Sequence, residues 1–197
     1  MTPRSRRLAI EAVVLIGVAV IAALVLKAFV AQAFSIPSAS MEPQLQPGDR
    51  VLVSRVAYRL HDPRRGDVIV FDAPNQPVGD DPVLPVRLIE DVLEGVGLKH
   101  PDETELIKRV VALEGEVVEA RGGRVLIDGR ELVEPYLPPD VATTDFGPVT
   151  VPAENVFVLG DNRGDSADSR VIGPIPVDSI VGRAIARAWP PWRWAWL

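Results

Sequence analysis

The chain has 197 residues, of which 47% are hydrophobic and 24% are charged, and this composition excludes an intrinsically disordered protein. It contains no cysteine, which excludes disulfides, cysteine nucleophiles and thiolate metal sites, and its net charge of −6 argues against nucleic acid as a partner. Its two histidines, His61 and His100, lie far apart, which argues against a zinc site or a Ser/His/Asp hydrolase.

The first predicted element is a membrane anchor. Residues 8–30 form one long apolar segment, and a helix of that length would measure about 34 Å, enough to cross a hydrocarbon core of about 30 Å. Arginines at positions 4, 6 and 7 precede this segment, so the positive-inside rule places residues 1–7 in the cytoplasm. We therefore expect a single-pass protein of the plasma (inner) membrane, with the rest of the chain on the extracytoplasmic side.

A cleaved signal peptide is the alternative interpretation of this segment. Ala31-Gln32-Ala33 has the small-x-small form of a cleavage site. The retained anchor is favoured because Lys27 interrupts the approach to that site, and because the apolar stretch is long for the core of a signal peptide. Whether the chain is cleaved after Ala33 stays open at this point.

Beyond the anchor, short apolar and β-branched runs alternate with turn residues, which predicts a mainly β fold. Gly122-Gly123 and Asp128-Gly129 are typical of tight turns between strands. The nineteen prolines fit many short strands and loops, since proline interrupts helices and central strands. The expected strands lie at residues 50–53, 68–71, 106–112, 116–119, 125–127, 132–133, 156–159 and 180–188.

Three polar segments interrupt this pattern. They are Ser38-Ala39-Ser40-Met41-Glu42-Pro43, the pair Lys108-Arg109 within an apolar strand, and the run from Gly160 to Arg170, which reads GDNRGDSADSR. Taken singly, they have ordinary interpretations as a linker, a solvated charge pair and a polar turn. The third segment lacks the acidic run and final glutamate of an EF-hand, which argues against calcium.

Together and in this order, the segments resemble the motifs of the bacterial type I signal peptidases, a family of serine proteases with a Ser/Lys dyad. Those motifs are S-x-S-M-x-P, R-G-D followed by three apolar residues and Phe, K-R followed by two apolar residues, and G-D-N-R-x-x-S-x-D-S-R. The chain supplies the second motif at residues 65–71. Two departures, Gln44 in place of a frequent threonine and residues 112–116 in place of G-L-P-G-D, remove no catalytic group.

The resemblance implies a membrane-anchored serine endopeptidase that removes N-terminal signal peptides from secreted preproteins at small-x-small sites. It implies Ser40 as the nucleophile, Lys108 as the general base, and an oxyanion hole made by the Ser38 hydroxyl and the Ser40 backbone N–H. It implies no metal and no organic cofactor; the partners would be signal peptides and the lipid bilayer. The remaining implied roles are lysine orientation by Ser166, support by Asp161, Asn162, Arg163, Asp168 and Arg170, and substrate contact by Ile36 and Met41.

A lysine suits the role of base only if its surroundings remove its proton. An exposed lysine has a pKa near 10.4, whereas burial penalises the charged form and can bring the pKa to about 7–8. Strand alternation places Lys108 on the same face as Leu106 and Val110, and Arg109 on the opposite face. The sequence therefore allows Lys108 to be shielded while Arg109 points elsewhere.

The predicted organisation follows from the resemblance. A signal-peptidase-like catalytic β domain, a sheet or barrel, spans residues 34–115 and 156–190, and a smaller β subdomain spans residues 116–155. Residues 73–104 are expected to be an inserted loop with an amphipathic helix between Val86 and Val96. Residues 191–197 belong to a Trp-rich tail that we expect at the membrane interface, with core packing as the alternative.

Two other classes of protein remain as alternatives. A Ser/Lys protease of the self-cleaving repressor type is disfavoured by the apolar segment at residues 8–30 and by the acidic body. A degenerate, non-enzymatic paralogue that binds signal sequences is disfavoured because Ser40 and Lys108 are both present.

Overall fold

The computed structural model describes residues 11–19, 31–73 and 105–197. Residues 11–19 are helical, and within the described residues no helix is both long and apolar enough to cross a membrane. The other parts of the predicted anchor, and the predicted insertion with its helix at Val86–Val96, lie outside the described residues.

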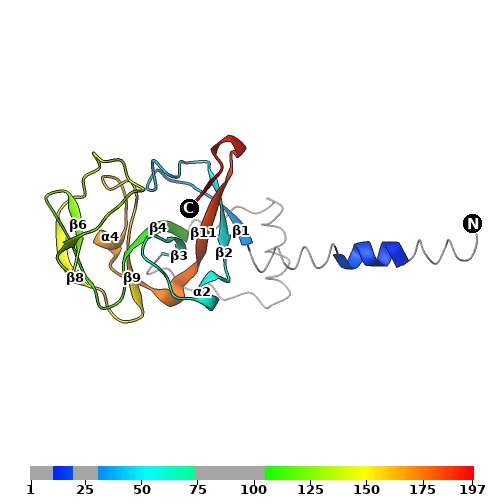
Figure 1. Cartoon of the computed structure of the whole chain (residues 1–197), viewed down its shortest axis with the longest axis horizontal. Coiled ribbons are helices and arrows are strands. Elements are labelled where there is room, and N and C mark those ends of the chain that lie inside the picture. The colour runs from blue at the N-terminus through cyan, green and yellow to red at the C-terminus, as the bar shows by residue number, and fades with distance from the viewer. Residues whose placement is uncertain (1–10, 20–30, 74–104) are drawn as a thin grey trace, which may run out of the picture.

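The larger part of the fold is an eight-stranded sheet in which every pairing is antiparallel (Figure 1). Its strand order is β1-β2-β11-β3-β4-β9-β10, and β12 pairs with β11. The strands are β1 (Ala31–Ser35), β2 (Arg50–Ser54), β3 (Val68–Asp72), β4 (Glu105–Ala112), β9 (Asn155–Leu159), β10 (Ile175–Pro176), β11 (Ile180–Trp189) and β12 (Ala195–Trp196). The mainly β fold expected from the sequence is therefore confirmed.

In the part of the chain that the structure describes, four short helices lie between the strands of this larger sheet. They are α2 (Ala57–Leu60), α4 (Ser169–Ile172) and the 3-10 turns η1 (Val177–Ser179) and η2 (Pro191–Arg193). The side chain of Asp168 caps α4 by accepting a bond from the Arg170 N–H, which fixes the polar run between β9 and β10.

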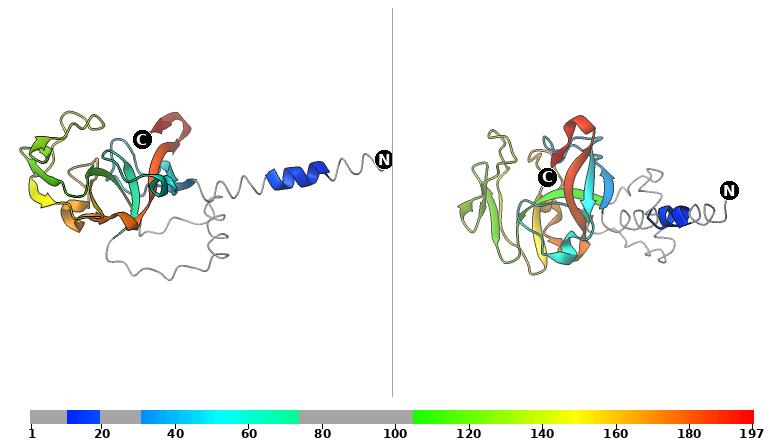
Figure 2. Two further views of the ribbon diagram at one scale, coloured as in Figure 1. Left: turned by 60° about the horizontal axis from the view of Figure 1, so that its bottom comes forward. Right: turned by 45° about the vertical axis from the view of Figure 1, so that its right-hand side comes forward.

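A second, four-stranded sheet in the order β7-β6-β5-β8 lies at one end of the molecule (Figure 2). Its strands are β5 (Val117–Arg121), β6 (Arg124–Ile127), β7 (Arg130–Glu131) and β8 (Phe146–Thr150). Gly122, Gly123, Asp128 and Gly129 all have positive φ, as the predicted tight turns require. The strand expected at residues 132–133 is wrong: the two-residue turn at Asp128-Gly129 pairs Arg130 directly with Ile127, so the strand comes two residues earlier.

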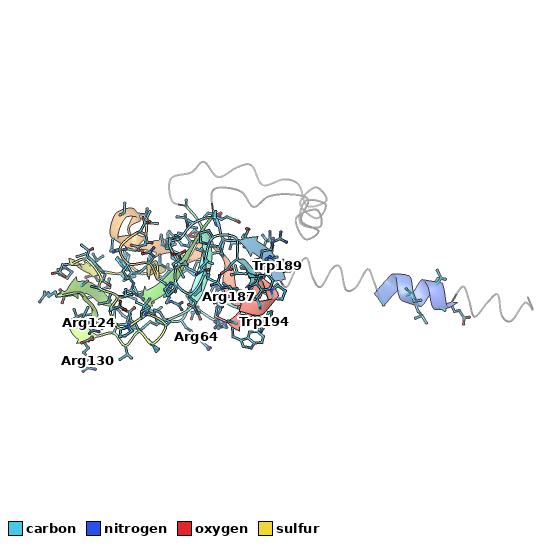
Figure 3. All side chains as sticks on the ribbon, turned by 90° about the horizontal axis from the view of Figure 1, so that it is seen from above. Arg64, Arg124, Arg130, Arg187, Trp189 and Trp194 are labelled. Atoms are coloured by element: carbon cyan, nitrogen blue, oxygen red, sulfur yellow. The ribbon has the colours of Figure 1, made fainter. Side chains whose placement is uncertain are left out.

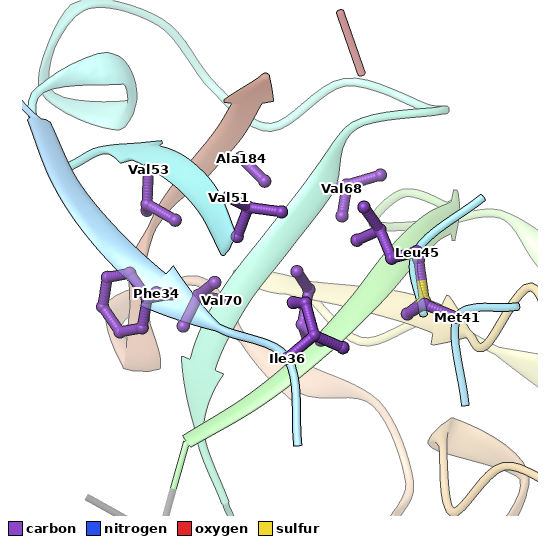
Figure 4. Packing of buried hydrophobic residues seen from close by; sticks show 10 residues of the cluster. Phe34, Ile36, Met41, Leu45, Val51, Val53, Val68, Val70 and Ala184 are labelled. Carbon is purple, nitrogen blue, oxygen red and sulfur yellow. The ribbon is translucent and has the colours of Figure 1, made fainter. Parts of the chain in front are cut away.

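The central strands β3, β4 and β9 of the larger sheet are buried on both faces, which explains the continuous apolar run of β3. Val68 and Val70 belong to one core cluster, whereas Ile69 and Phe71 belong to another on the opposite face. The first cluster also contains Ile36, Met41 and Leu45 from the segment that follows β1 (Figure 4). A third cluster joins residues of β4 and β9 to residues of β5 and β6, and so connects the two sheets.

Candidate active site

The two serines predicted to act in catalysis lie in a closed loop between β1 and β2, here called the serine segment (residues 36–49). The Ile36 N–H donates to the Asp49 carbonyl at 2.8 Å, and the Gly48 N–H donates back to the Ile36 carbonyl at 2.9 Å. Met41 and Leu45 are fully buried and anchor the loop in the core. Ser40 is 8% exposed, and its Oγ lies 3.2 Å from the Oγ of Ser38.

Lys108 reaches the serine segment from β4. Its Nζ donates to Ser40 Oγ at 2.8 Å and to the Ile107 carbonyl at 2.8 Å, and the residue is only 3% exposed. Burial strips water from the ammonium and lowers the pKa of Lys108 from 10.5 to about 8, although the negative charges of Asp168 and Asp161 act in the opposite direction. The fold therefore places a shielded amine against a serine hydroxyl 68 positions away in the chain.

The run from Gly160 to Arg170 forms a turn that touches the serine segment. The Asn162 N–H donates to the Ser40 carbonyl at 3.1 Å, and the Asn162 side-chain amide donates to the Ala39 carbonyl at 3.2 Å. Next to it, Asp161 is fully buried and accepts two bonds from Arg109, at 2.8 Å and 2.7 Å. The turn thus holds the backbone that carries Ser40.

Arg109, next to Lys108 in β4, is buried and bonded to protein groups, whereas a solvated charge pair would place it in water. It is 3% exposed, and besides Asp161 it donates to the Gly66 carbonyl at 2.8 Å and to Gln44 Oε1. Its guanidinium also lies 3.9 Å from the centre of the Tyr136 ring, a cation–π geometry. Arg109 therefore joins the motif R-G-D, the serine segment and the polar turn.

Asp168 forms the predicted ion pair with Arg170, with bonds of 2.8 Å to both carboxylate oxygens. Its Oδ2 also accepts the Gly160 N–H at 2.9 Å. Burial alone would raise the pKa of Asp168, but these hydrogen bonds outweigh burial and hold its pKa below the usual range. Asp168 is therefore ionised at neutral pH, within electrostatic reach of Lys108.

Arg163 connects the turn to the smaller sheet. It donates to the Gly160 carbonyl at 3.1 Å, to Thr143 Oγ1 at 2.8 Å and to both carboxylate oxygens of Glu134. Burial acts to lower the pKa of Arg163, but bonding to Glu134 outweighs it and raises that pKa. Glu134 and Tyr136 were not predicted as site residues, because they lie in a loop that matches no motif.

Three predicted residues lie in the expected region without showing their predicted contacts. Ser166 Oγ is buried and forms no hydrogen bond within the described residues, so its lysine-orienting role stays a prediction. Ile36 and Met41 are 2% and 0% exposed, and they pack in the core cluster that contains Val68 and Val70. Their role in lining substrate pockets also stays a prediction.

Comparisons with known proteins identify the family of the chain. The family model described as "Signal peptidase, peptidase S26" matches residues 9–189. A signal peptidase I of Mycobacterium tuberculosis is 39% identical, covering 98% of this chain and 76% of that protein, and one of Leptolyngbya laminosa is 40% identical, covering 95% and 83%. A crystal structure of a signal peptidase I from Enterococcus faecalis V583 is 28% identical with a TM-score of 0.44, covering 62% of this chain and 96% of that chain.

The family model spans most of the chain, and the alignments with both relatives cover nearly the full length of this chain. The motifs that carried the resemblance all lie within the matched residues. The chain therefore belongs to the peptidase S26 family of signal peptidases and is a serine endopeptidase.

Proposed function

We propose that the chain removes N-terminal signal peptides from secreted preproteins at small-x-small sites, with Ser40 as nucleophile and Lys108 as general base. The observation that carries the proposal is the 2.8 Å contact between Lys108 Nζ and Ser40 Oγ, in surroundings that lower the pKa of Lys108 to about 8. The similarity to proteins described as signal peptidase I supports the choice of substrate.

In this mechanism, the unprotonated Nζ of Lys108 accepts the hydroxyl proton while Ser40 Oγ bonds to the scissile carbonyl carbon. The carbonyl oxygen becomes an oxyanion that accepts hydrogen bonds from the Ser40 N–H and the Ser38 hydroxyl. The Lys108 ammonium then returns its proton to the leaving amine as the peptide bond breaks. Water, deprotonated by the same amine, hydrolyses the acyl-enzyme and restores Ser40.

The substrate is proposed to bind as an extra strand beside the first half of β4. Residues 105–109 of β4 pair with β3 on one side, whereas pairing with β9 begins only at Arg109. Among the described residues, no strand pairs with this second side of β4 at residues 106–108, and the extended peptide is proposed to pair there, with backbone hydrogen bonds that would be independent of its sequence. Small side chains before the scissile bond would fit shallow apolar pockets near Ile36 and Met41.

The function is tested with the purified full chain and a peptide carrying an Ala-x-Ala site. Ser40→Ala is expected to abolish cleavage, and Ser38→Ala to lower kcat by about a hundredfold or more as an oxyanion donor is lost. Ser179→Ala, in η1 away from the site, serves as the matched control. For the wild type, kcat/KM is expected to rise about tenfold per pH unit and to level off above about pH 8, since only the neutral amine accepts a proton.

Two results would refute this function. Cleavage by Ser40→Ala would exclude Ser40 as the nucleophile. Failure of the folded wild type to cut any small-x-small peptide would favour the degenerate paralogue that only binds signal sequences.

Gly160→Ala is expected to inactivate the enzyme because no room exists for a methyl group. A Cβ at Gly160 would lie 2.5 Å from the Ser40 carbonyl oxygen and 2.2 Å from Ser166 Oγ, so the nucleophile's backbone would have to move. A displacement of about 1 Å at a reacting group can cost about a hundredfold in rate. Gly164→Ala, in the same turn but with open space around its Cβ, is expected to keep full kcat, and equal rates for both variants would contradict the prediction.

The membrane placement is proposed on the same basis. Residues 8–30 would be the anchor, with residues 1–7 in the cytoplasm and both sheets on the extracytoplasmic side. The four tryptophans gather at residues 189–196 and are 50–82% exposed, which suits the membrane–water interface. The Trp-rich tail at residues 191–197 would then contact lipid headgroups.

The lipid contact of this tail can be tested directly because three of the four tryptophans of the chain lie within it and the fourth, Trp189, lies two residues before it. In vesicles containing lipids with brominated acyl chains, the fluorescence of the full-length protein is expected to be quenched strongly. Trp192→Phe with Trp196→Phe removes the two most exposed indoles and is expected to remove most of the quenched signal. Unquenched wild-type fluorescence would show that the tail lies away from lipid.

A further inference from the structure

The end of β11, η2 and β12 form a compact unit, here called the tryptophan hairpin (residues 187–197). β12 folds back on β11, pairing Ala186 with Trp196, and the Leu197 N–H donates to the Ile185 carbonyl at 3.1 Å. Figure 3 shows Arg187 at the same end of the molecule as Trp189 and Trp194. No motif of the family resemblance includes this unit, yet both of its arginines hydrogen-bond to the serine segment.

Arg193 of the tryptophan hairpin forms a partly buried ion pair with the serine segment. Its Nη1 donates to both carboxylate oxygens of Asp49, at 2.7 Å and 2.9 Å. The Asp49 side chain is 3% exposed and that of Arg193 is 23% exposed. A carboxylate this well shielded depends strongly on its cation, because burying an unpaired charge is costly.

Asp49 in turn closes the serine segment. Its carbonyl accepts the Ile36 N–H at 2.8 Å, its Oδ2 accepts the Gln46 N–H at 2.9 Å, and its own N–H donates to the Gln46 carbonyl at 3.0 Å. Ser38 and Ser40 lie between the two points, Ile36 and Gln46, that Asp49 holds together. The position of the nucleophile therefore depends on the carboxylate that Arg193 neutralises.

A second arginine of the tryptophan hairpin, Arg187, also hydrogen-bonds to the serine segment. Arg187 donates through Nη1 to the Gln44 carbonyl and through Nε to the Arg193 carbonyl. Arg187 thus binds the serine segment directly and also fixes the residue that pairs with Asp49. Since Gln44 Oε1 accepts from Arg109, the segment is held from the hairpin on one side and from β4 on the other.

We propose that Arg193 is a positioning residue: through its ion pair with Asp49, the tryptophan hairpin holds the serine segment so that Ser40 Oγ stays against Lys108 Nζ. This inference rests on the proposed function of Ser40 and Lys108. Loss of the Arg193 guanidinium leaves the Asp49 carboxylate bonded to the Gln46 N–H but without its ion-pair partner, while Arg187 remains a cation within electrostatic reach. The segment then relaxes toward water to solvate the carboxylate. Ser40 then spends less time in the reactive geometry, which affects kcat and leaves substrate binding along β4 intact.

The test compares Arg193→Met and Arg193→Lys in the full chain, with the same Ala-x-Ala peptide. Arg193→Met is expected to lower kcat tenfold to a hundredfold with KM unchanged within twofold, and Arg193→Lys to recover part of that loss. Arg124→Met is the matched control, since Arg124 pairs with Glu131 on the surface of the smaller sheet with both side chains more than half exposed. Its kcat is expected to equal that of the wild type.

Asp49→Asn combined with Arg193→Met removes both charges and is expected to be more active than Arg193→Met alone. The double variant also keeps the test decisive if Arg193→Met fails to fold. Hydrogen exchange measured by mass spectrometry is expected to be faster for residues 36–49 in Arg193→Met and unchanged in β5 and β6.

The proposal is overturned if Arg193→Met keeps kcat within twofold of the wild type, or if the double variant gains nothing over the single one. A wild type without any cleavage would instead refute the proposed function, and exchange in residues 36–49 would still decide whether Arg193 holds the segment.

Discussion

Lys108→Met is expected to abolish cleavage and at the same time to stabilise the folded chain at pH 7. Methionine fills similar space without a charge. The folded chain binds a proton at Lys108 with a pKa of about 8, below its ordinary value of 10.5, so protonation favours the unfolded chain. This cost, about 3 kcal/mol, is fully present below pH 8 and is lost as the pH rises through 10.5.

The net gain in stability is smaller because Met forms neither of the hydrogen bonds that Lys108 makes to Ser40 and Ile107. Each such bond contributes about 1 kcal/mol, which leaves a gain of about 1 kcal/mol at pH 7. Without a base, Ser40 keeps its proton, and kcat is expected to fall at least about a thousandfold.

Denaturant unfolding at pH 7 and pH 10, together with kcat on the Ala-x-Ala peptide, measures both effects. The stability difference between Lys108→Met and the wild type should shrink or change sign toward pH 10, where the wild-type lysine is neutral. A difference in unfolding free energy that is independent of pH would contradict the account, as would substantial cleavage by Lys108→Met.

Arg109→Met is expected to give the second large effect, a loss of about 3–5 kcal/mol in unfolding free energy. Asp161 is fully buried and its carboxylate is neutralised by Arg109, whose side chain is 4% exposed. Removing the guanidinium leaves a buried, uncompensated carboxylate and also removes the stacking on Tyr136. The free carboxylate attracts the Lys108 ammonium, so the pKa of Lys108 is expected to rise above 8 and the pH–rate profile to move to higher pH.

Asp161→Asn is the matched variant with the opposite expected sign. It removes a charge that raises the pKa of Lys108, so the midpoint of kcat/KM should move below pH 8. Combining Arg109→Met with Asp161→Asn should recover part of the lost stability, because no unpaired charge remains. Identical midpoints in Arg109→Met, Asp161→Asn and the wild type would show that this ion pair does not influence the base.

The strands could be predicted wherever a single local pattern dominates. Apolar runs bounded by turn residues predicted β2, β3, β4, β9 and β11. Each end of these strands lies within one residue of the predicted end. β8 was missed because Gly147-Pro148 interrupts its pattern, and both residues are unfavourable in strands. β1 was missed because Ala31-Gln32-Ala33 was interpreted only as a possible cleavage site.

The site could be predicted only through the motifs. Nothing local indicates that Lys108 meets Ser40, since that contact depends on β4 lying between β3 and β9. The same limit applies to Arg193 and Asp49, which are 144 positions apart and form their ion pair only after β11 has paired with β2. The exposed tryptophans of the hairpin indicate a contact with lipid, whereas Arg187 and Arg193 connect the hairpin to the serine segment.

The most direct test of the central claim is a titration of the Lys108 amine itself. The chain has three lysines, at positions 27, 99 and 108, so ¹⁵N labelling of lysine Nζ gives a spectrum simple enough to assign with Lys108→Met. We predict that Lys108 titrates with a pKa of about 8 in the wild type. Titration of Lys108 near 10.5, as for a lysine in water, would contradict its role as the base that activates Ser40.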